Sequence, residues 1–191
     1  MRLRVHDRRL RDGTLELRPL TEDDWDALME WNRDAEVLLY SEGDDVAERT
    51  LEEVRAIFRA VSRRAFTFLV LLDGRPIGDA WLQEMNLERV RRRFDPAADL
   101  RRIDLTIGVK ELWGLGLGTR VIGMLTRMGF EEGADALFGC DIGVANSRSR
   151  RAFEKNGYRL LQTAVVRGKT VFDLALPRAR EGGVRGRDQR R

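Results

Sequence analysis

A glycine-rich turn between a strand-like run and a helix-like run restricts the fold of this chain more than any other feature. Residues 102–109 read RIDLTIGV, and residues 113–119 read WGLGLGT. After Gly116, apolar residues recur at the spacing of one helix face, at Val121, Ile122, Leu125 and Met128. The apolar run LFGCDIGV follows at 137–144. A strand, a helix and a second strand in this order predict a β–α–β unit with two parallel strands.

Two hairpins are predicted outside that unit. Asp73-Gly74 joins two β-rich runs between residues 65 and 82, and an Asp-Gly pair suits a tight hairpin because both turn positions need positive φ. A second pair of β-rich runs closes the chain about Gly168. A further strand is predicted at 14–20, where leucines alternate with polar residues.

Three helices are predicted from their capping residues. Thr21 precedes an acidic first turn and is the expected N-cap of one helix. Thr50 and Glu53 form a capping-box pattern ahead of apolar residues at helical spacing. Asn146 is the expected N-cap of the last helix, which should end at Gly157 because glycine suits the left-handed position after a helix.

Together these elements predict a single α/β (α+β) domain with a mixed, mostly antiparallel sheet flanked by helices. We expect this domain to span residues 13–176 of the 191, which is long enough for one core. Residues 1–12 and 177–191 carry charges of +3 and +4 and few apolar residues, so we expect mobile tails. The segment between them carries about −4. Solvated tails are therefore favoured, and the alternative is an RNA-associated protein that binds nucleic acid through its basic tails alone.

Composition narrows the chemistry and the compartment. The chain has one cysteine, Cys140, and one histidine, His6, so a Cys/His metal cluster, an intrachain disulfide and a histidine-based triad are excluded. No apolar run approaches the roughly 20 residues that span a bilayer, and the charged N-terminus lacks the apolar stretch of a signal peptide. We expect a cytoplasmic protein without a metal, whose chemistry uses carboxylates, tyrosines, hydroxyls and backbone groups.

The glycine turn has the properties of an anion site. Gly114, Gly116 and Gly118 let a ligand approach the backbone, and the free N–H groups of a helix's first turn suit a pyrophosphate. A turn without any ligand explains these glycines equally well. A phosphate loop is excluded because no Gly-Lys-Ser/Thr follows, and the dinucleotide fingerprint fits poorly because the three glycines alternate.

Two motifs at compatible spacing are more specific than the turn alone. The stretch IDLTIGVKELWGLGLGT, followed by a helix, a strand and NSRSRRAFEKNGY, resembles the GNAT superfamily of N-acetyltransferases over roughly residues 13–176. The glycine segment resembles the branch of ribosomal-protein N-terminal acetyltransferases, whereas Ile103-Asp104 resembles aminoglycoside and siderophore N-acetyltransferases. The resemblance implies acetyl-CoA as acyl donor and an amine-bearing acceptor that attacks directly. The identity of the acceptor stays open, as does assembly into a homodimer.

The resemblance also implies which residues bind the coenzyme. Backbone N–H groups from Leu115 through Thr119 would hold its pyrophosphate. The backbone of residues 107–109 would pair with the pantetheine arm and polarise the thioester, and Asn146 would reach the same arm. The full coenzyme-binding set is Ile107, Gly108, Val109, Gly114, Leu115, Gly116, Leu117, Gly118, Thr119, Asn146 and Phe153.

Three positions depart from the family pattern. Trp113 and Leu115 stand where many members have basic or Gln residues, which leaves phosphate binding to the backbone and the helix dipole. Phe153 stands where many members have the tyrosine proposed to protonate the departing thiolate. Tyr158 is a poor substitute because the family usually packs Phe there, and water suffices because a thiol pKa lies near 8.5. The missing tyrosine keeps open a non-catalytic acyl-CoA-binding module.

Asp104 is the candidate catalytic residue and also a candidate substrate-binding residue. A carboxylate can orient an ammonium group and remove its proton before attack, and Asp is disfavoured inside a strand without a special role. The alternative is an ion pair with Arg101 or Arg102.

The remaining candidates surround the acceptor. Tyr40 and Glu42, with Asp44 and Asp45, are expected in a loop that flanks the acceptor pocket in this family, where acidic groups attract a cationic amine. A solvated loop is the alternative. The arginine run 89–93 would meet an anionic group or the coenzyme's phosphate, with solvated surface as its alternative.

Overall fold

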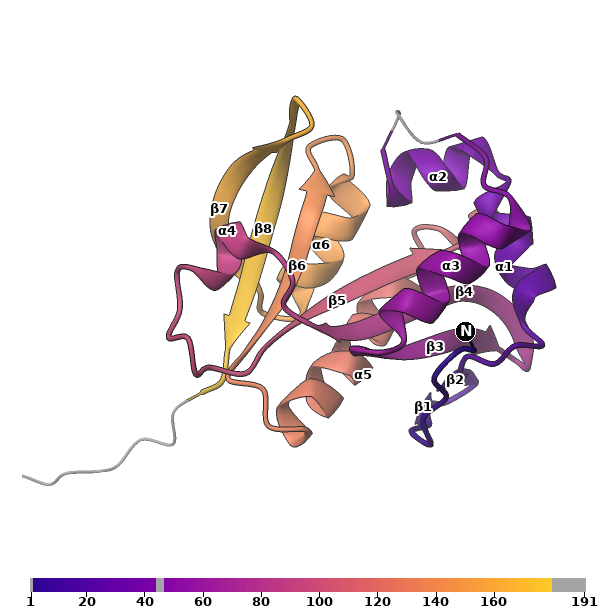
Figure 1. Cartoon of the computed structure of the whole chain (residues 1–191), viewed down its shortest axis with the longest axis horizontal. Helices are drawn as coiled ribbons and strands as arrows, with labels where there is room; N and C mark the ends of the chain where they lie inside the picture. Colours follow the sequence, from indigo (N-terminus) through magenta and orange to yellow (C-terminus); the bar gives the residue numbers. More distant parts are fainter. Residues whose placement is uncertain (1, 44–46, 180–191) are drawn as a thin grey trace, which may run out of the picture.

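The computed structural model describes residues 2–43 and 47–179, which form one mixed sheet with helices on both faces (Figure 1). The strand order is β1-β2-β3-β4-β5-β6-β8-β7. The strands are β1 Leu10–Asp12, β2 Leu15–Pro19, β3 Ala65–Leu72, β4 Arg75–Glu84, β5 Leu100–Ile107, β6 Ala136–Gly143, β7 Arg159–Val166 and β8 Lys169–Pro177. Each neighbouring pair is antiparallel except β5 and β6, which are parallel. The predicted α/β fold class is confirmed.

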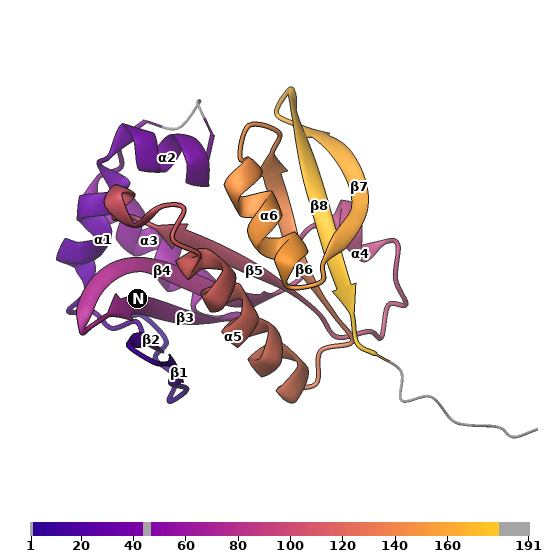
Figure 2. The ribbon, with the colours of Figure 1, turned by 180° about the vertical axis from the view of Figure 1, so that it is seen from behind.

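Helices cover the two faces of the sheet in separate groups. They are α1 Trp25–Asn32, α2 Ala35–Ser41, α3 Leu51–Val61, α4 Glu88–Arg91, α5 Leu117–Glu131 and α6 Ser147–Lys155. Figure 1 shows α1 and α3 in front of the sheet, and Figure 2 shows α5 and α6 on the opposite side. One apolar cluster packs α5 against the sheet, and a second packs α1 and α3 against β3 and β4.

The predicted β–α–β unit consists of β5, α5 and β6, and its two strands separate soon after they pair. Their register runs only from Leu100–Ala136 to Arg102–Phe138, although β5 continues to Ile107 and β6 to Gly143. Both views show the far ends of β5 and β6 apart, with α2 on one side of the opening and α6 on the other (Figures 1 and 2).

Several local predictions are confirmed in detail. Asp73 and Gly74 both have positive φ, of 50° and 78°, at the β3–β4 turn. Thr50 and Glu53 form the complete capping box of α3. The Asn146 side chain accepts a hydrogen bond from the Ser149 N–H at 3.1 Å and so caps α6.

The N-terminal segment is packed on the domain, which corrects the prediction of a tail over residues 1–12. Leu3 is buried in the cluster beneath α1, and the His6 ring lies edge-on to Phe66 and Phe68. Residues 10–12 pair with β2. The sparse apolar residues of this segment are thus used for docking. Residues 180–191 lie outside the described part of the chain.

One helix prediction and one loop prediction also need correction. The helix expected to begin at Thr21 begins at Trp25, because the Asp24 carboxylate accepts the Thr21 N–H at 2.8 Å and also pairs with Arg18. Tyr40 lies in helix α2 rather than in a loop. Asp34 caps α2, since its side chain accepts the N–H groups of residues 36 and 37.

Candidate active site

The glycine turn leads directly into an uncapped helix. Gly114 and Gly116 have left-handed φ values of 83° and 81°, so glycine is required there by the backbone itself. The first turn of α5 has no side-chain cap and no acidic residue. A Cβ built on Gly114 or Gly116 would meet no atom within 4 Å, so the surface over the turn is open. Open backbone N–H groups at a helix N-terminus are suited to an anion such as a pyrophosphate.

The end of β5 is more enclosed than the sequence indicated. The Gly108 N–H donates to the Ile77 carbonyl at 2.8 Å, and the Val109 N–H points at the same oxygen at 3.4 Å. The Trp113 indole N–H donates to the Ile107 carbonyl at 2.6 Å. These contacts differ from the expectation that residues 107–109 offer free backbone groups to a pantetheine arm. The Gly108 N–H is thus already bonded to β4, and the Trp113 side chain joins the glycine turn to the end of β5.

Asn146 and Tyr40 join the two sides of the opening between β5 and β6. Besides capping α6, the Asn146 side chain donates to the Tyr40 carbonyl at 2.8 Å. The Arg148 guanidinium lies 4.3 Å from the ring centres of both Tyr40 and Trp113. The Asn146 side chain therefore contacts α2, and its contact with the coenzyme's arm stays a prediction. A cation is nevertheless present beside the turn, supplied by α6 instead of by position 113.

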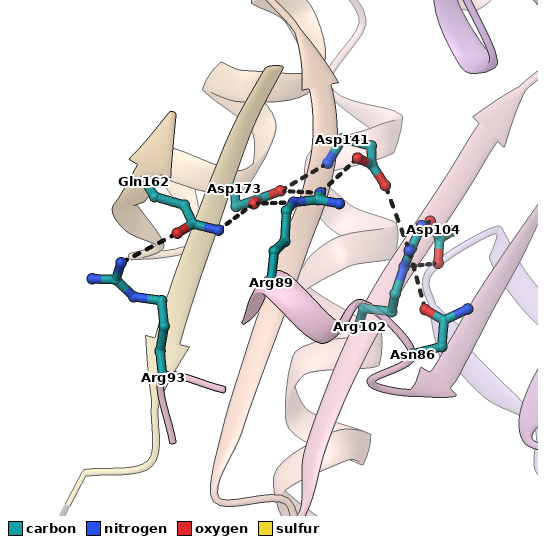
Figure 3. A network of polar contacts seen from close by, with 8 residues as sticks. All are labelled: Asn86, Arg89, Arg93, Arg102, Asp104, Asp141, Gln162 and Asp173. Carbon is teal, nitrogen blue, oxygen red and sulfur yellow. Dashed lines mark hydrogen bonds and ion pairs between the residues drawn. The ribbon is translucent and has the colours of Figure 1, made fainter. Parts of the chain in front are cut away.

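Asp104 lies within a network of arginines and carboxylates (Figure 3). Its carboxylate pairs through both oxygens with Arg102 and accepts the Gln83 amide N–H at 2.6 Å. Arg102 also reaches Asp141 at 3.6 Å, so its guanidinium lies between the two carboxylates. The ion pair with Arg102 was the alternative that the sequence left open. The Asp104 side chain remains 24% exposed, so a ligand can still reach it.

The arginine run begins with a structural residue. Arg89 pairs with Asp173, which is fully buried, and with Asp141 at 2.6 Å. Farther out, Arg93 contacts Gln162, whose amide donates to Asp173 (Figure 3). Both the coenzyme-phosphate role and the solvated alternative fail for Arg89, because its guanidinium neutralises two carboxylates of this chain.

The two aromatic rings near the expected thiolate position are buried. Phe153 packs edge-on against Tyr158 at 5.0 Å between ring centres. The Tyr158 hydroxyl is 2.8 Å from the Thr126 hydroxyl on α5, and burial raises the pKa of Tyr158 well above its ordinary value. A phenol that is buried and already bonded cannot readily give its proton to a thiolate.

Asp79 is the residue that sequence reasoning missed. It lies on β4, is only 7% exposed, and is opposite Thr106 of β5. Burial raises the pKa of its carboxyl from an ordinary 3.8 to about 8, with Glu42 and Asp104 adding to the rise and Arg49 opposing it. Its sequence signal, an aspartate inside a strand, is the same one that drew attention to Asp104.

Glu42 lies at the end of α2 and pairs with Arg49 at 3.1 Å. Asp44 and Asp45 lie outside the described residues.

The described ranges contain no cluster of three His, Cys, Asp or Glu side chains placed to hold a metal ion. In the same ranges, no helix is both long and apolar enough to cross a membrane.

Comparison with known proteins identifies related chains. Residues 14–159 match the family described as the acetyltransferase (GNAT) domain. Aminoglycoside N(6')-acetyltransferase type 1 from Klebsiella pneumoniae is 26% identical over 161 residues, covering 77% of this chain and 75% of the relative. The same values hold for the protein of that name from Serratia marcescens.

Solved structures share the fold at lower identity. A structure of the aminoglycoside acetyltransferase AAC(6')-Ib with ribostamycin and coenzyme A has a TM-score of 0.75 and 23% identity, covering 87% of this chain and 94% of the other. A ribosomal alpha-N-protein acetyltransferase, RimL, in complex with coenzyme A has a TM-score of 0.68 and 16% identity, covering 87% and 95%.

Proposed function

Because the chain belongs to the GNAT acetyltransferase family and is an acetyl-CoA-dependent N-acetyltransferase, we propose that its acceptor is a cationic primary amine. The acceptor is a small molecule or a protein N-terminus, and its amine attacks the thioester directly within a ternary complex. The observation that carries the acyl-donor site is the uncapped first turn of α5, with its two left-handed glycines, beside the separating ends of β5 and β6.

In this proposal the coenzyme's pyrophosphate binds the backbone N–H groups from Leu115 through Thr119. The helix dipole and the N–H groups of residues 116–119 supply the attraction, whereas the Leu115 N–H already points at the Leu112 carbonyl at 3.5 Å. Arg148 adds a nearby positive charge. Holding donor and acceptor in one complex accounts for much of the rate, because it replaces a bimolecular encounter with a pre-oriented one.

Asp104 is proposed to face the acceptor and orient its ammonium group. Arg102 and Gln83 hold the carboxylate in one position, and its exposed edge remains available. The same contacts weigh against Asp104 as the base, since both oxygens already accept hydrogen bonds from an arginine. An acceptor cation must share Asp104 with Arg102, which favours one well-placed ammonium group over a dense polycation.

Thr119 offers a direct test of the donor site. It is the third residue of α5, where an acidic side chain stabilises a helix through the helix dipole. Thr119→Glu should therefore keep or raise the melting temperature while repelling a pyrophosphate. We expect acetyl-CoA affinity to fall by at least ten-fold in Thr119→Glu and to change little in the neutral control Thr119→Gln. Equal acetyl-CoA affinity in both variants would place the coenzyme elsewhere.

A further inference from the structure

Asp79 is a buried carboxyl group without a partner in the described part of the chain. The residue is 7% exposed, and no hydrogen bond or ion pair joins its side chain to any residue within 2–43 or 47–179. The other buried aspartates of the described ranges each pair with an arginine. Asp24, 8% exposed, pairs with Arg18, and the fully buried Asp173 pairs with Arg89. Because an unpaired buried charge is costly, an unpaired buried aspartate needs a reason.

The strand register places Asp79 beside the proposed acceptor site. Asp79 is opposite Thr106, and Trp81, two residues along the same face of β4, is opposite Asp104. On its other side Asp79 faces Leu69 of β3, which belongs to the apolar cluster under α1. Glu42 after α2 and Arg49 before α3 are close enough to influence its charge, as is Asp104 on β5.

A second unpartnered polar group lies on the same strand face. The Trp81 indole N–H is buried and has no hydrogen-bond acceptor among the described residues. One face of β4 thus carries both an unpaired acid and an unpaired donor. Native interiors rarely leave such groups unsatisfied, and ligand sites are a recurrent reason when they do.

We propose that Asp79 is the catalytic proton acceptor, the group that takes one proton from the acceptor's ammonium before attack. This inference rests on the proposed N-acetyl transfer and divides the work between two aspartates. Asp104, fixed by Arg102, holds the ammonium in place, and Asp79, which has no competing cation, receives its proton.

The ammonium nitrogen gives one proton to the Asp79 carboxylate, and the resulting neutral amine forms the new C–N bond to the thioester carbon. As the C–S bond breaks, the sulfur takes the electron pair, and the nitrogen's second proton passes to the sulfur directly or through water. Asp79 then returns its proton to solvent, so the net products are an amide, a thiol and one proton.

The environment of Asp79 suits this task. A proton acceptor works best when its pKa is near the operating pH, and burial places the pKa of Asp79 at about 8. That value already includes the carboxylates of Glu42 and Asp104, which add to the effect of burial, and Arg49, which opposes it. A bound ammonium would stabilise the ionised form, so amine binding and proton transfer are coupled at this residue.

The first test measures Asp79 without any acceptor. In the full-length protein, the carboxyl carbon of Asp79, assigned by its loss in Asp79→Asn, should titrate between pH 7 and 9 in NMR spectra. Titration below pH 5 would show an ordinary carboxylate and overturn the proposal, whether or not the enzyme acetylates any amine tried.

The second test uses the pH dependence of turnover with two primary alkylamines of different basicity, butylamine and 2-methoxyethylamine. In the wild type, kcat/KM should rise with pH along a limb whose apparent pKa is near 8 for both amines, because this rising limb of the pH profile reports ionisation of Asp79. In Asp79→Asn, kcat/KM near pH 7 should fall by about 10²–10³, and the limb should move to the pKa of each amine.

Asp24→Asn is the matched control, since Asp24 is buried to nearly the same degree but, unlike Asp79, is already paired with a cation, Arg18. It should lower stability and leave the pH profile unchanged. Acetyl-CoA affinity should be unaltered in Asp79→Asn. Retention of the wild-type profile in Asp79→Asn would refute the inference alone, whereas absence of turnover in the wild type with every amine would refute the proposed function.

Discussion

Replacing Asp79 with Asn should make the protein more stable, by an amount that grows with pH. The Asp79 pKa is about 8 in the folded protein and near 3.8 when the carboxyl is exposed to water. Between these values the folded state holds a proton that the unfolded state has lost, so wild-type stability falls as pH rises. The slope from this one group is about 1.4 kcal/mol per pH unit. Below pH 4 and above pH 8 the group contributes no slope.

From pH 5 to pH 7.5, the wild type should therefore lose about 3 kcal/mol of unfolding free energy that Asp79→Asn retains. For a chain of this size, that corresponds to a relative shift of about 10 °C in melting temperature. The assay is thermal or urea unfolding of both proteins from pH 4 to pH 9. The two should coincide near pH 4 and separate steadily up to pH 8.

In the same assay, the Asp24 carboxylate should change the free energy of unfolding with pH in the opposite direction to Asp79. The Asp24 carboxyl is buried, yet the hydrogen bonds and charge of Arg18 keep the pKa of Asp24 below its ordinary value. Its pair therefore stabilises the fold above the unfolded pKa, and this stabilisation is lost as the pH falls through the folded pKa. Parallel curves for wild type and Asp79→Asn across the range would refute the reasoning about Asp79.

Two further predictions concern the reacting groups. Because Asp104 is proposed to orient the acceptor, Asp104→Asn should raise KM for the amine several-fold in steady-state kinetics and leave kcat and acetyl-CoA affinity largely unchanged. A fall in kcat of about 10²-fold would instead make Asp104 the base. Tyr158→Phe should lower the free energy of unfolding by about 1 kcal/mol, because the hydrogen bond to Thr126 is lost, and should leave turnover within two-fold. Phe153→Tyr should also leave turnover within two-fold. A large fall in kcat for Tyr158→Phe with coenzyme binding intact would identify Tyr158 as the thiolate's proton donor.

The elements that could be predicted from sequence are those whose cause is local. Asp73-Gly74 and the Thr50–Glu53 box act within four residues, so their geometry follows from the residue types alone. The β5–α5–β6 unit was also predictable, because its hydrophobic spacing and glycine turn agree. Its role in binding a coenzyme came from the family resemblance and stays a prediction for a chain that matches the family over residues 14–159.

The features that escaped prediction depend on partners distant in sequence. Leu3 is buried because it packs into the apolar cluster under α1, and the short segment around it has no hydrophobic periodicity that would predict this contact. The hydrogen bond from the Gly108 N–H to the Ile77 carbonyl depends on the pairing register of β4 and β5, which the sequence does not reveal. Asp79 and Asp104 look alike in sequence, but only the structure shows that Arg102 pairs with one and that no described residue pairs with the other.

Transfer of an acetyl group to an amine is the central claim, and mass spectrometry of acceptor products tests it most directly. The protein would be incubated with acetyl-CoA and a panel of aminoglycosides, polyamines, hydroxylated lysine, simple alkylamines and N-terminal peptides, while free thiol is monitored. We expect at least one amine to gain a single acetyl group in step with thiol release, and Asp79→Asn to slow both near pH 7. Tight binding of acetyl-CoA with no acetylated amine across the panel would contradict the account and favour a non-catalytic coenzyme-binding module.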